Sequence, residues 1–420
     1  MKKCYSAADV LLPDLKKYDA SKWAVVACDQ FTSEPEYWER AEMIVGDAPS
    51  TLNMILPEVY LEKTSEKIPQ INACMSQYEK DILQELPDSM IYVERTQSDG
   101  TVRHGIVLAI DLECYDYRRG ADSLIRATEA TVIERIPPRV AIRERAPLEL
   151  PHVMLLIDDP ERTVIEPLRS TECGEVIYDF ELMLGGGQIR GTLISDEYKS
   201  AISKALDALI IPENMEKKYG SRELSPLMFA VGDGNHSLAS AKATYEKVKA
   251  SIGADAAAVH PARYALVEVV NIHDDSLVFE PIYRIMTDVD QVDVLKSLEA
   301  YVKTLSGNAG KQTINYIFGD TEGAIEIASA EQQLTVGTLQ IFIDDYIASH
   351  NSAKVDYIHG VDSVRALAQK ENSIGFIFDG MEKSKLFKTV IFDGALPRKT
   401  FSMGHAEDKR YYLECRKITK

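Results

Sequence analysis

No apolar run in the sequence approaches the roughly 18 residues needed to span a bilayer, and no signal-peptide core follows the first residues. Internal repeats, low-complexity tracts and Cys-x-x-Cys pairs are also lacking. Positive charge is scarce, because 47 Lys and Arg residues stand against 66 Asp and Glu, a net charge of -19. A field of this sign repels nucleic acid and anionic membranes, so we expect neither as a partner. We expect a cytoplasmic protein.

The six cysteines are scattered along 420 residues without neighbouring histidines, which predicts reduced thiols and no zinc site. This length and a hydrophobic content of 45% allow two or three domains with buried cores. We expect a mixed N-terminal segment over 1–80 that packs on the next domain, a domain over 81–275, and a C-terminal α/β domain over 276–420.

Hydrophobic periodicity predicts a mixed α/β chain of the α+β class. A hairpin turn is expected at Asp99 and Gly100. The glycines of residues 184–187 favour a hairpin connection over a phosphate loop. Helices are expected over 36–45, 67–86, 292–305, 336–348 and 384–392, and strands over 23–28, 90–94, 102–112, 313–318 and 324–328.

The stretch from Val231 to Ser237 combines two glycines with an acid, an amide and an imidazole. Residues 227–231 are short and apolar and predict a buried strand, whereas the Ala-rich residues 238–248 predict a helix with Ser237 as its N-cap. The first N–H groups of a helix lack partners within it and carry the positive end of its dipole. This strand–turn–helix arrangement predicts an anion site. An ordinary Asp-Gly turn with a capped helix is an equally well supported interpretation.

The motif at 232–237 resembles the Asp-Gly-His-His-Arg signature of family 1015 among the domains of unknown function. Residues 23–29 are similar to the N-terminal segment of that family, and residues 396–400 to its C-terminal stretch. Residues 126–131, with Arg139 downstream, resemble its His-Glu-Arg-Thr motif. The family itself resembles the ParB/sulfiredoxin-like superfamily, which implies a nucleotide-binding domain of that kind plus a second α/β domain.

The superfamily includes free serine kinases, so the resemblance implies a nucleotide-dependent phosphotransferase. The expected acceptor is a hydroxylated metabolite such as an amino acid, and the expected cofactor is ATP or ADP with Mg²⁺. The residues implied as catalytic are Glu129, Asp233 and His236, with Asp233 also contacting the metal. The residues implied in binding the nucleotide are Gly232, Gly234, Asn235, Ser237, Arg126, Thr131, Arg139 and Lys399.

Three positions depart from the family pattern, since Thr128, Asn235 and Ser237 replace a His, a His and an Arg. A serine cannot hold a phosphate bidentately as an arginine does, which favours a non-catalytic nucleotide- or metabolite-binding protein as the alternative. A structural or interaction protein and a metal-dependent hydrolase are further alternatives. The motif contains no cysteine, which argues against sulfinic acid reduction. The oligomeric state stays open, a homo-oligomer included, and His152 is expected to be a core histidine.

Overall fold

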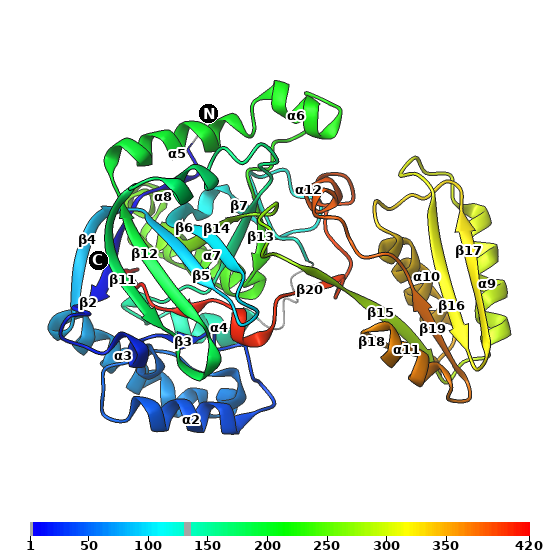
Figure 1. Cartoon of the computed structure of the whole chain (residues 1–420), viewed down its shortest axis with the longest axis horizontal. Helices are drawn as coiled ribbons and strands as arrows, with labels where there is room; N and C mark the ends of the chain where they lie inside the picture. The colour runs from blue at the N-terminus through cyan, green and yellow to red at the C-terminus, as the bar shows by residue number, and fades with distance from the viewer. Residues whose placement is uncertain (1–2, 130–135) are drawn as a thin grey trace. The chain divides into compact units, whose positions relative to one another are not determined.

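The computed structural model describes residues 3–129 and 136–420, which divide into two compact units (Figure 1). Unit 1 takes the described residues of 1–127, 131–277 and 404–420, and unit 2 takes those of 128–130 and 278–403. Residues 1–80 and 81–275 therefore share one unit, to which the chain returns after unit 2.

A ten-stranded sheet forms the centre of unit 1. Its strand order is β11-β12-β5-β6-β14-β10-β13-β8-β7, and β1 pairs with β6. Neighbouring strands are antiparallel except for the pairs β10–β14, β13–β8 and β7–β8. The strands are β1 Tyr5–Ser6, β5 Ile91–Thr96, β6 Val102–Asp111, β7 Tyr115–Asp116, β8 Ile125–Arg126, β10 Met154–Ile157, β11 Gly174–Glu181, β12 Gln188–Ile194, β13 Phe229–Asp233 and β14 Tyr264–Asn271.

Both faces of this sheet are covered, as the central strand β6 shows. Ile106 and Leu108 belong to the core on one face, and Val107 and Ala109 to the core on the other. A strand buried on both faces reads as a nearly continuous apolar run, which is why its prediction from residues 102–112 is confirmed.

The helices of unit 1 surround this sheet and are partly as expected. The helix over 36–45 is confirmed, whereas the helix expected over 67–86 ends at Asp81 and its last residues form a strand. They do so because Leu83 and Leu86 pack against the core from β4. The helices are α1 Ala20–Trp23, α2 Pro35–Val45, α3 Thr64–Asp81, α4 Ile136–Arg143, α5 Asp196–Ala208, α6 Pro212–Tyr219, α7 Asn235–Ile252 and α8 Ala254–Ala258.

Three short strand pairs complete unit 1, and two of them bring the C-terminal segment back to it. β21 Tyr411–Tyr412 pairs with β3 Val25–Val26, and β22 Arg416–Lys417 pairs with β9 Leu148–Glu149. The third pair joins β2 Ala8–Pro13 to β4 Leu83–Ser89.

Both predicted hairpins are confirmed. Asp99 and Gly100 connect β5 to β6, where Gly100 adopts a φ of +84°. The glycines of 184–187 connect β11 to β12.

Unit 2 contains a six-stranded sheet of order β17-β16-β19-β15-β18, with β20 also pairing with β15. The helices predicted over 292–305, 336–348 and 384–392 and the strands predicted over 313–318 and 324–328 are confirmed, but β15, β18, β19, β20 and α11 were not anticipated. The strands are β15 Phe279–Thr287, β16 Gln312–Phe318, β17 Thr321–Ile327, β18 Lys354–His359, β19 Ser373–Ile377 and β20 Phe401–Met403. The helices are α9 Gln291–Thr304, α10 Thr335–Ser349, α11 Val361–Ala368 and α12 Lys383–Phe392.

The mixed α/β (α+β) class is thus confirmed. The six cysteines are free thiols, as expected. Within 3–129 and 136–420, no helix has the length and apolar character that crossing a membrane requires.

Candidate functional site

The turn between β13 and α7 consists of Gly234 alone. This residue adopts a φ of +78°, and a Cβ there would lie 3.1 Å from Val153 Cα, so glycine suits both the conformation and the space. Helix α7 begins at Asn235, which places Ser237 in its first turn. The prediction of Ser237 as N-cap is therefore wrong, because the left-handed glycine starts the helix earlier.

The N-terminus of α7 is suited to an anion. The helix runs for 18 residues, its first turn has no acidic residue, and its N-cap is a glycine, which has no side chain to cap it. A helix end of this kind presents N–H groups together with the positive end of the dipole. One carboxylate oxygen of Asp233 binds within the β13–α7 turn, because Oδ1 accepts the Gly234 N–H at 3.0 Å.

The other oxygen of Asp233 faces a lysine from the C-terminal segment. Lys409 Nζ lies 3.2 Å from Asp233 Oδ2, and the two side chains are 17% and 23% exposed. Lys409 reaches this place because the neighbouring Arg410 carbonyl accepts the Ala27 N–H at 3.0 Å and β21 then pairs with β3. The β13–α7 turn thus has a cation and a carboxylate that both reach solvent.

His152 lies on the other side of the α7 first turn. Its Nε2 is 3.2 Å from Ser237 Oγ and 3.6 Å from Asp29 Oδ2, and its Nδ1 is 2.8 Å from the Tyr412 hydroxyl. The Tyr412 hydroxyl also donates to Cys28 Sγ at 3.0 Å. His152 is buried with partners for both ring nitrogens, as expected of a core histidine, yet those partners place it beside the motif.

The charges around His152 favour its protonated form. Burial disfavours the imidazolium, but the Asp29 carboxylate and its hydrogen bond outweigh burial and raise the pKa of His152. Burial likewise opposes the ionisation of Asp29, whose pKa is nevertheless lowered by His152 and by Lys409. Burial and the charge of Asp29 raise the pKa of the Cys28 thiol to about 12. Cys28 is therefore a neutral hydrogen-bonding group at neutral pH, whereas the Asp29 carboxylate favours the protonated form of His152.

A cavity of about 140 Å³ opens beside these residues, and we call it the site cavity. Ser237, His152 and Tyr412 line it, but Asp233 and Lys409 do not. The first turn of α7 therefore separates a charged, partly exposed side from an enclosed side. The enclosed side also contains the ion pair between Arg139 and Glu58, while Leu56, Leu150, Leu238 and Leu266 supply apolar wall.

The residues predicted within the motif stay together at this turn. Gly232 faces Leu156, whose Cγ would lie 2.8 Å from a Cβ at that position. Asn235, His236 and Ser237 form the half-buried first turn of α7. Arg139 is brought to the site cavity by α4.

Other predicted residues lie elsewhere or belong to unit 2. Arg126 donates to the carbonyls of Ser123, Ser225 and Pro226, before the start of β13 and hence at the opposite end of that strand from Asp233. Glu129 belongs to unit 2 and forms a β-bridge with Leu396. The binding role of Arg126 and the catalytic role of Glu129 stay predictions.

Lys399 also belongs to unit 2, where Nζ lies 5.0 Å from the centre of the Tyr357 ring. Its carbonyl accepts a hydrogen bond from Arg284 at 3.1 Å. Thr131 lies outside the described residues. The roles of both stay predictions.

Sequence reasoning missed Asp29, Lys409 and Tyr412 as site residues. Asp29 ends the segment matched to the N-terminal part of the family, which was a usable signal. Lys409 and Tyr412 lie in no sequence motif. The pairing of β21 with β3, between the two ends of unit 1, brings them to the β13–α7 turn.

No metal centre is preassembled in the described part of the chain, where no three His, Cys, Asp or Glu side chains are grouped to hold an ion. Mg²⁺ does not need such a group, because it is usually held by one or two carboxylates, phosphate oxygens and water. Asp233 is one carboxylate of that kind beside the anion-binding end of α7.

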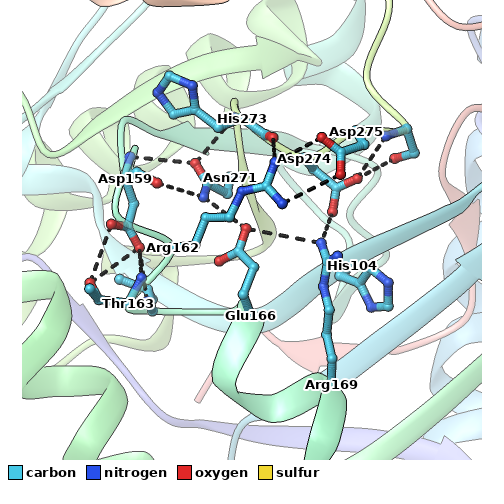
Figure 2. A network of polar contacts seen from close by, with 12 residues as sticks. His104, Asp159, Arg162, Thr163, Glu166, Arg169, Asn271, His273, Asp274 and Asp275 are labelled. Carbon is cyan, nitrogen blue, oxygen red and sulfur yellow. Dashed lines mark hydrogen bonds and ion pairs between the residues drawn. The ribbon is translucent and has the colours of Figure 1, made fainter.

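A second polar cluster of unit 1 follows the parallel strands β10 and β14 (Figure 2). Asn271 donates to the Asp159 carbonyl at 2.8 Å and to Glu166 Oε1 at 2.9 Å, and Arg169 donates to Asp274 Oδ2 at 2.6 Å. These hydrogen bonds join the segment that follows β10 to the segment that follows β14, which indicates a structural role in holding residues 271–276 in place.

The family model described as a protein of unknown function, DUF1015, matches residues 13–417. This match confirms the family resemblance found in the sequence. No curated protein matches the chain.

Several solved structures resemble the chain at low sequence identity. A free serine kinase mutant in complex with ADP has 10% identity and a TM-score of 0.38, over 74% of this chain and 92% of that chain. A conserved hypothetical protein from Pyrococcus furiosus has 10% identity and a TM-score of 0.35, over 74% and 95%. SbnI with a C-terminal truncation, from Staphylococcus aureus, has 11% identity and a TM-score of 0.34, over 71% and 82%.

Proposed function

The chain belongs to the DUF1015 family, and we propose that this member is a nucleotide-dependent phosphotransferase acting on a small hydroxylated metabolite such as an amino acid. The observation that carries the proposal is the pair of Lys409 and Asp233 at the N-terminus of α7, whose N-cap is Gly234. The motif residues support a ParB/sulfiredoxin-like nucleotide-binding part as the finer assignment. Six free thiols fit a reducing, cytoplasmic setting.

The exposed side of the α7 turn supplies what a transferred phosphate requires. Phosphoryl transfer depends mainly on positioning and on neutralising charge at the phosphate oxygens. The α7 N-terminus and the Lys409 ammonium contribute positive charge, and Asp233 is the residue that would hold Mg²⁺. Bound there with ATP or ADP, the metal would neutralise further phosphate charge.

The enclosed side suits the acceptor. The site cavity has about 140 Å³, apolar walls and the Arg139–Glu58 ion pair, so it accommodates a small polar molecule. Ser237 and His152 stand where this cavity meets the α7 turn, and the raised pKa of His152 favours an imidazolium that would donate to a hydroxyl group there. Glu129 keeps its predicted role as base or substrate orienter, on the basis of the family motif.

The test is transfer from labelled ATP, with Mg²⁺, to a panel of amino acids and other hydroxylated metabolites. Asp233→Asn and Glu129→Gln are expected to lose transfer by at least about a hundredfold, as general acid–base and charge-neutralising groups do. Asp255→Asn, at an exposed acid of α8, is the matched control and should keep the wild-type rate. Rates unchanged in both Asp233→Asn and Glu129→Gln would remove these roles.

A binding protein without catalysis is the second candidate. It is favoured by Ser237, which occupies the place of the family's arginine and contacts His152 instead of offering a guanidinium fork. Calorimetry with ADP and ATP separates the candidates, because a binding protein gives heat with nucleotide but no transfer.

A further inference from the structure

A second cavity of about 400 Å³ lies in unit 1 between α2, α3 and the segment that connects them. Its walls combine aliphatic and polar side chains from both helices and from the connecting segment. The aliphatic residues are Val45, Leu52, Ile55, Leu56 and Ile71. This volume and lining are typical of a small-molecule site.

One short helical segment separates this cavity from the site cavity. η2, the 3₁₀ helix Glu58–Lys63, and Pro57 before it divide their side chains between the two. Pro57 and Tyr60 line the second cavity, whereas Glu58 and Leu61 line the site cavity. Residues three apart in a 3₁₀ helix lie on the same face, which explains this division. Leu56 lines both cavities.

The backbone of η2 is irregular near its centre. Tyr60 has φ −111° and ψ 21°, which departs from 3₁₀ values and breaks the helix within its only two turns. On the far face, Glu58 forms its ion pair with Arg139 of α4. A displacement of Tyr60 from the second cavity would therefore be transmitted to the Glu58–Arg139 pair.

Lys67 is the feature of the second cavity that favours an anionic ligand, and the neutral amides Asn53 and Gln70 also line it. Lys67 is half-buried, and its ammonium has no hydrogen-bond or ion-pair partner among the described residues. Glu42, the carboxylate in the lining, is exposed and solvated. A half-buried cation beside aliphatic walls matches a ligand with an apolar body and a carboxylate group.

We propose that the second cavity binds a small aliphatic carboxylate through Lys67 and that its occupancy is transmitted by η2 to the site cavity. The carboxylate pairs with the Lys67 ammonium while the aliphatic chain fills the space lined by Leu52, Ile55 and Ile71. The ligand presses on Pro57 and Tyr60, and the opposite face of η2 moves Glu58 against Arg139. The regulatory part of this proposal rests on the proposed function of the site cavity, whereas the binding part does not.

The binding part is tested by calorimetry of the full chain with octanoate and with octan-1-ol, which has the same chain length without the charge. Octanoate is expected to bind, and Lys67→Gln is expected to weaken its binding about tenfold or more while leaving octan-1-ol unaffected. Lys80→Gln, on an exposed part of the same helix, should behave as the wild type. The absence of octanoate binding, or equal affinity in Lys67→Gln, overturns the proposal.

A second variant guards against nonspecific binding. Cys74→Phe fills the cavity from its α3 wall without removing charge, and it should abolish octanoate binding. Circular dichroism shows whether the Cys74→Phe protein is folded like the wild type. A folded Cys74→Phe protein that binds octanoate like the wild type overturns this location.

Transmission is tested by hydrogen exchange, which needs no activity. Octanoate should slow exchange over residues 57–63 and change it over α4, and Glu58→Gln should abolish the α4 response while octanoate still binds. If octanoate leaves the hydrogen-exchange rates of α4 unchanged, the proposed transmission from the second cavity to the site cavity is overturned. If α4 responds but ADP never binds, the proposed function fails and the carboxylate site stands.

Discussion

Lys409 Nζ lies 3.2 Å from Asp233 Oδ2, although residues 278–403 of unit 2 separate the two in sequence. The pair puts a cation and a carboxylate at the start of α7. A ligand phosphate at the helix end would compete with Asp233 for the lysine.

Lys409→Met is therefore expected to weaken ADP binding about tenfold or more, because a hydrogen bond to a charged group contributes about 1.5–3 kcal/mol. Calorimetry at two salt concentrations measures both the loss and its electrostatic origin. Lys217→Met, at an exposed lysine paired with Glu161, is the control and should bind ADP normally. Equal affinity in both variants would place the phosphate elsewhere.

The His152–Asp29 pair predicts a pH dependence. The pKa of His152 is raised above its ordinary value near 6.5, so its contribution to stability is complete below about pH 6.5 and is lost as the pH rises through the folded-state pKa. Asp29→Asn removes the charge that outweighs burial, and the pKa of His152 should then fall below the ordinary value. The free energy of unfolding between pH 6 and 9, with histidine titration by NMR, measures both effects.

His104 is the internal control for that titration. Burial, with the charge of Arg169, lowers its pKa to about 4, and its Nδ1 lies 2.6 Å from the Tyr92 hydroxyl. It should titrate at low pH in both proteins. An unchanged His152 pKa in Asp29→Asn would contradict the ion-pair interpretation.

Glu268 predicts a large loss of stability when its charge is removed. Its side chain is 1% exposed, and it forms an ion pair with Arg410 and lies 3.6 Å from Arg103 Nε. Glu268→Gln leaves the buried Arg103 and Arg410 with one carboxylate fewer, although Arg410 keeps Glu414, and it should cost about 3–5 kcal/mol in the free energy of unfolding. Trp23 and Trp38 both lie in unit 1, so their fluorescence in urea reports this transition.

The matched control is Glu322→Gln, which breaks the exposed Arg365–Glu322 pair and should cost only about 0–1 kcal/mol. Because Glu322 belongs to unit 2, its unfolding is followed by circular dichroism. Similar losses in the two variants would show that burial does not set the contribution of the Glu268 pair.

Gly234→Ala should affect both stability and binding. Forcing a residue with a Cβ into the left-handed region costs about 1–2 kcal/mol, and here the Cβ also comes 3.1 Å from Val153 Cα. Gly220→Ala is the control, because its φ is +84° and its Cβ would meet nothing within 4 Å. Gly234→Ala should unfold more easily than Gly220→Ala, and it alone should weaken ADP binding.

Elements with a clear period were predictable from sequence, whereas those set by distant contacts were not. Helices α2, α9 and α10 have apolar positions at helical spacing. After α3, Leu83 and Leu86 continue a helical spacing, yet pairing of β4 with β2 makes that stretch a strand. Tertiary pairing outweighed local periodicity there.

The candidate site shows the same limit. The motif predicted the β13–α7 turn because glycine and helix-start chemistry are local. His152, Asp29, Lys409 and Tyr412 come from separate segments, and no spacing in the sequence relates them. His152 in particular follows a Leu-Pro pair and precedes an apolar strand, a context that also suits a core position.

The return of residues 404–420 to unit 1 has a consequence for synthesis on the ribosome. Strand β3 cannot pair with β21 until all of unit 2 has been synthesised. The nascent chain therefore lacks Lys409, Arg410 and Tyr412 until unit 2 has been synthesised, and a message cut short after residue 403 would yield a protein that contains the whole motif without these three residues beside it.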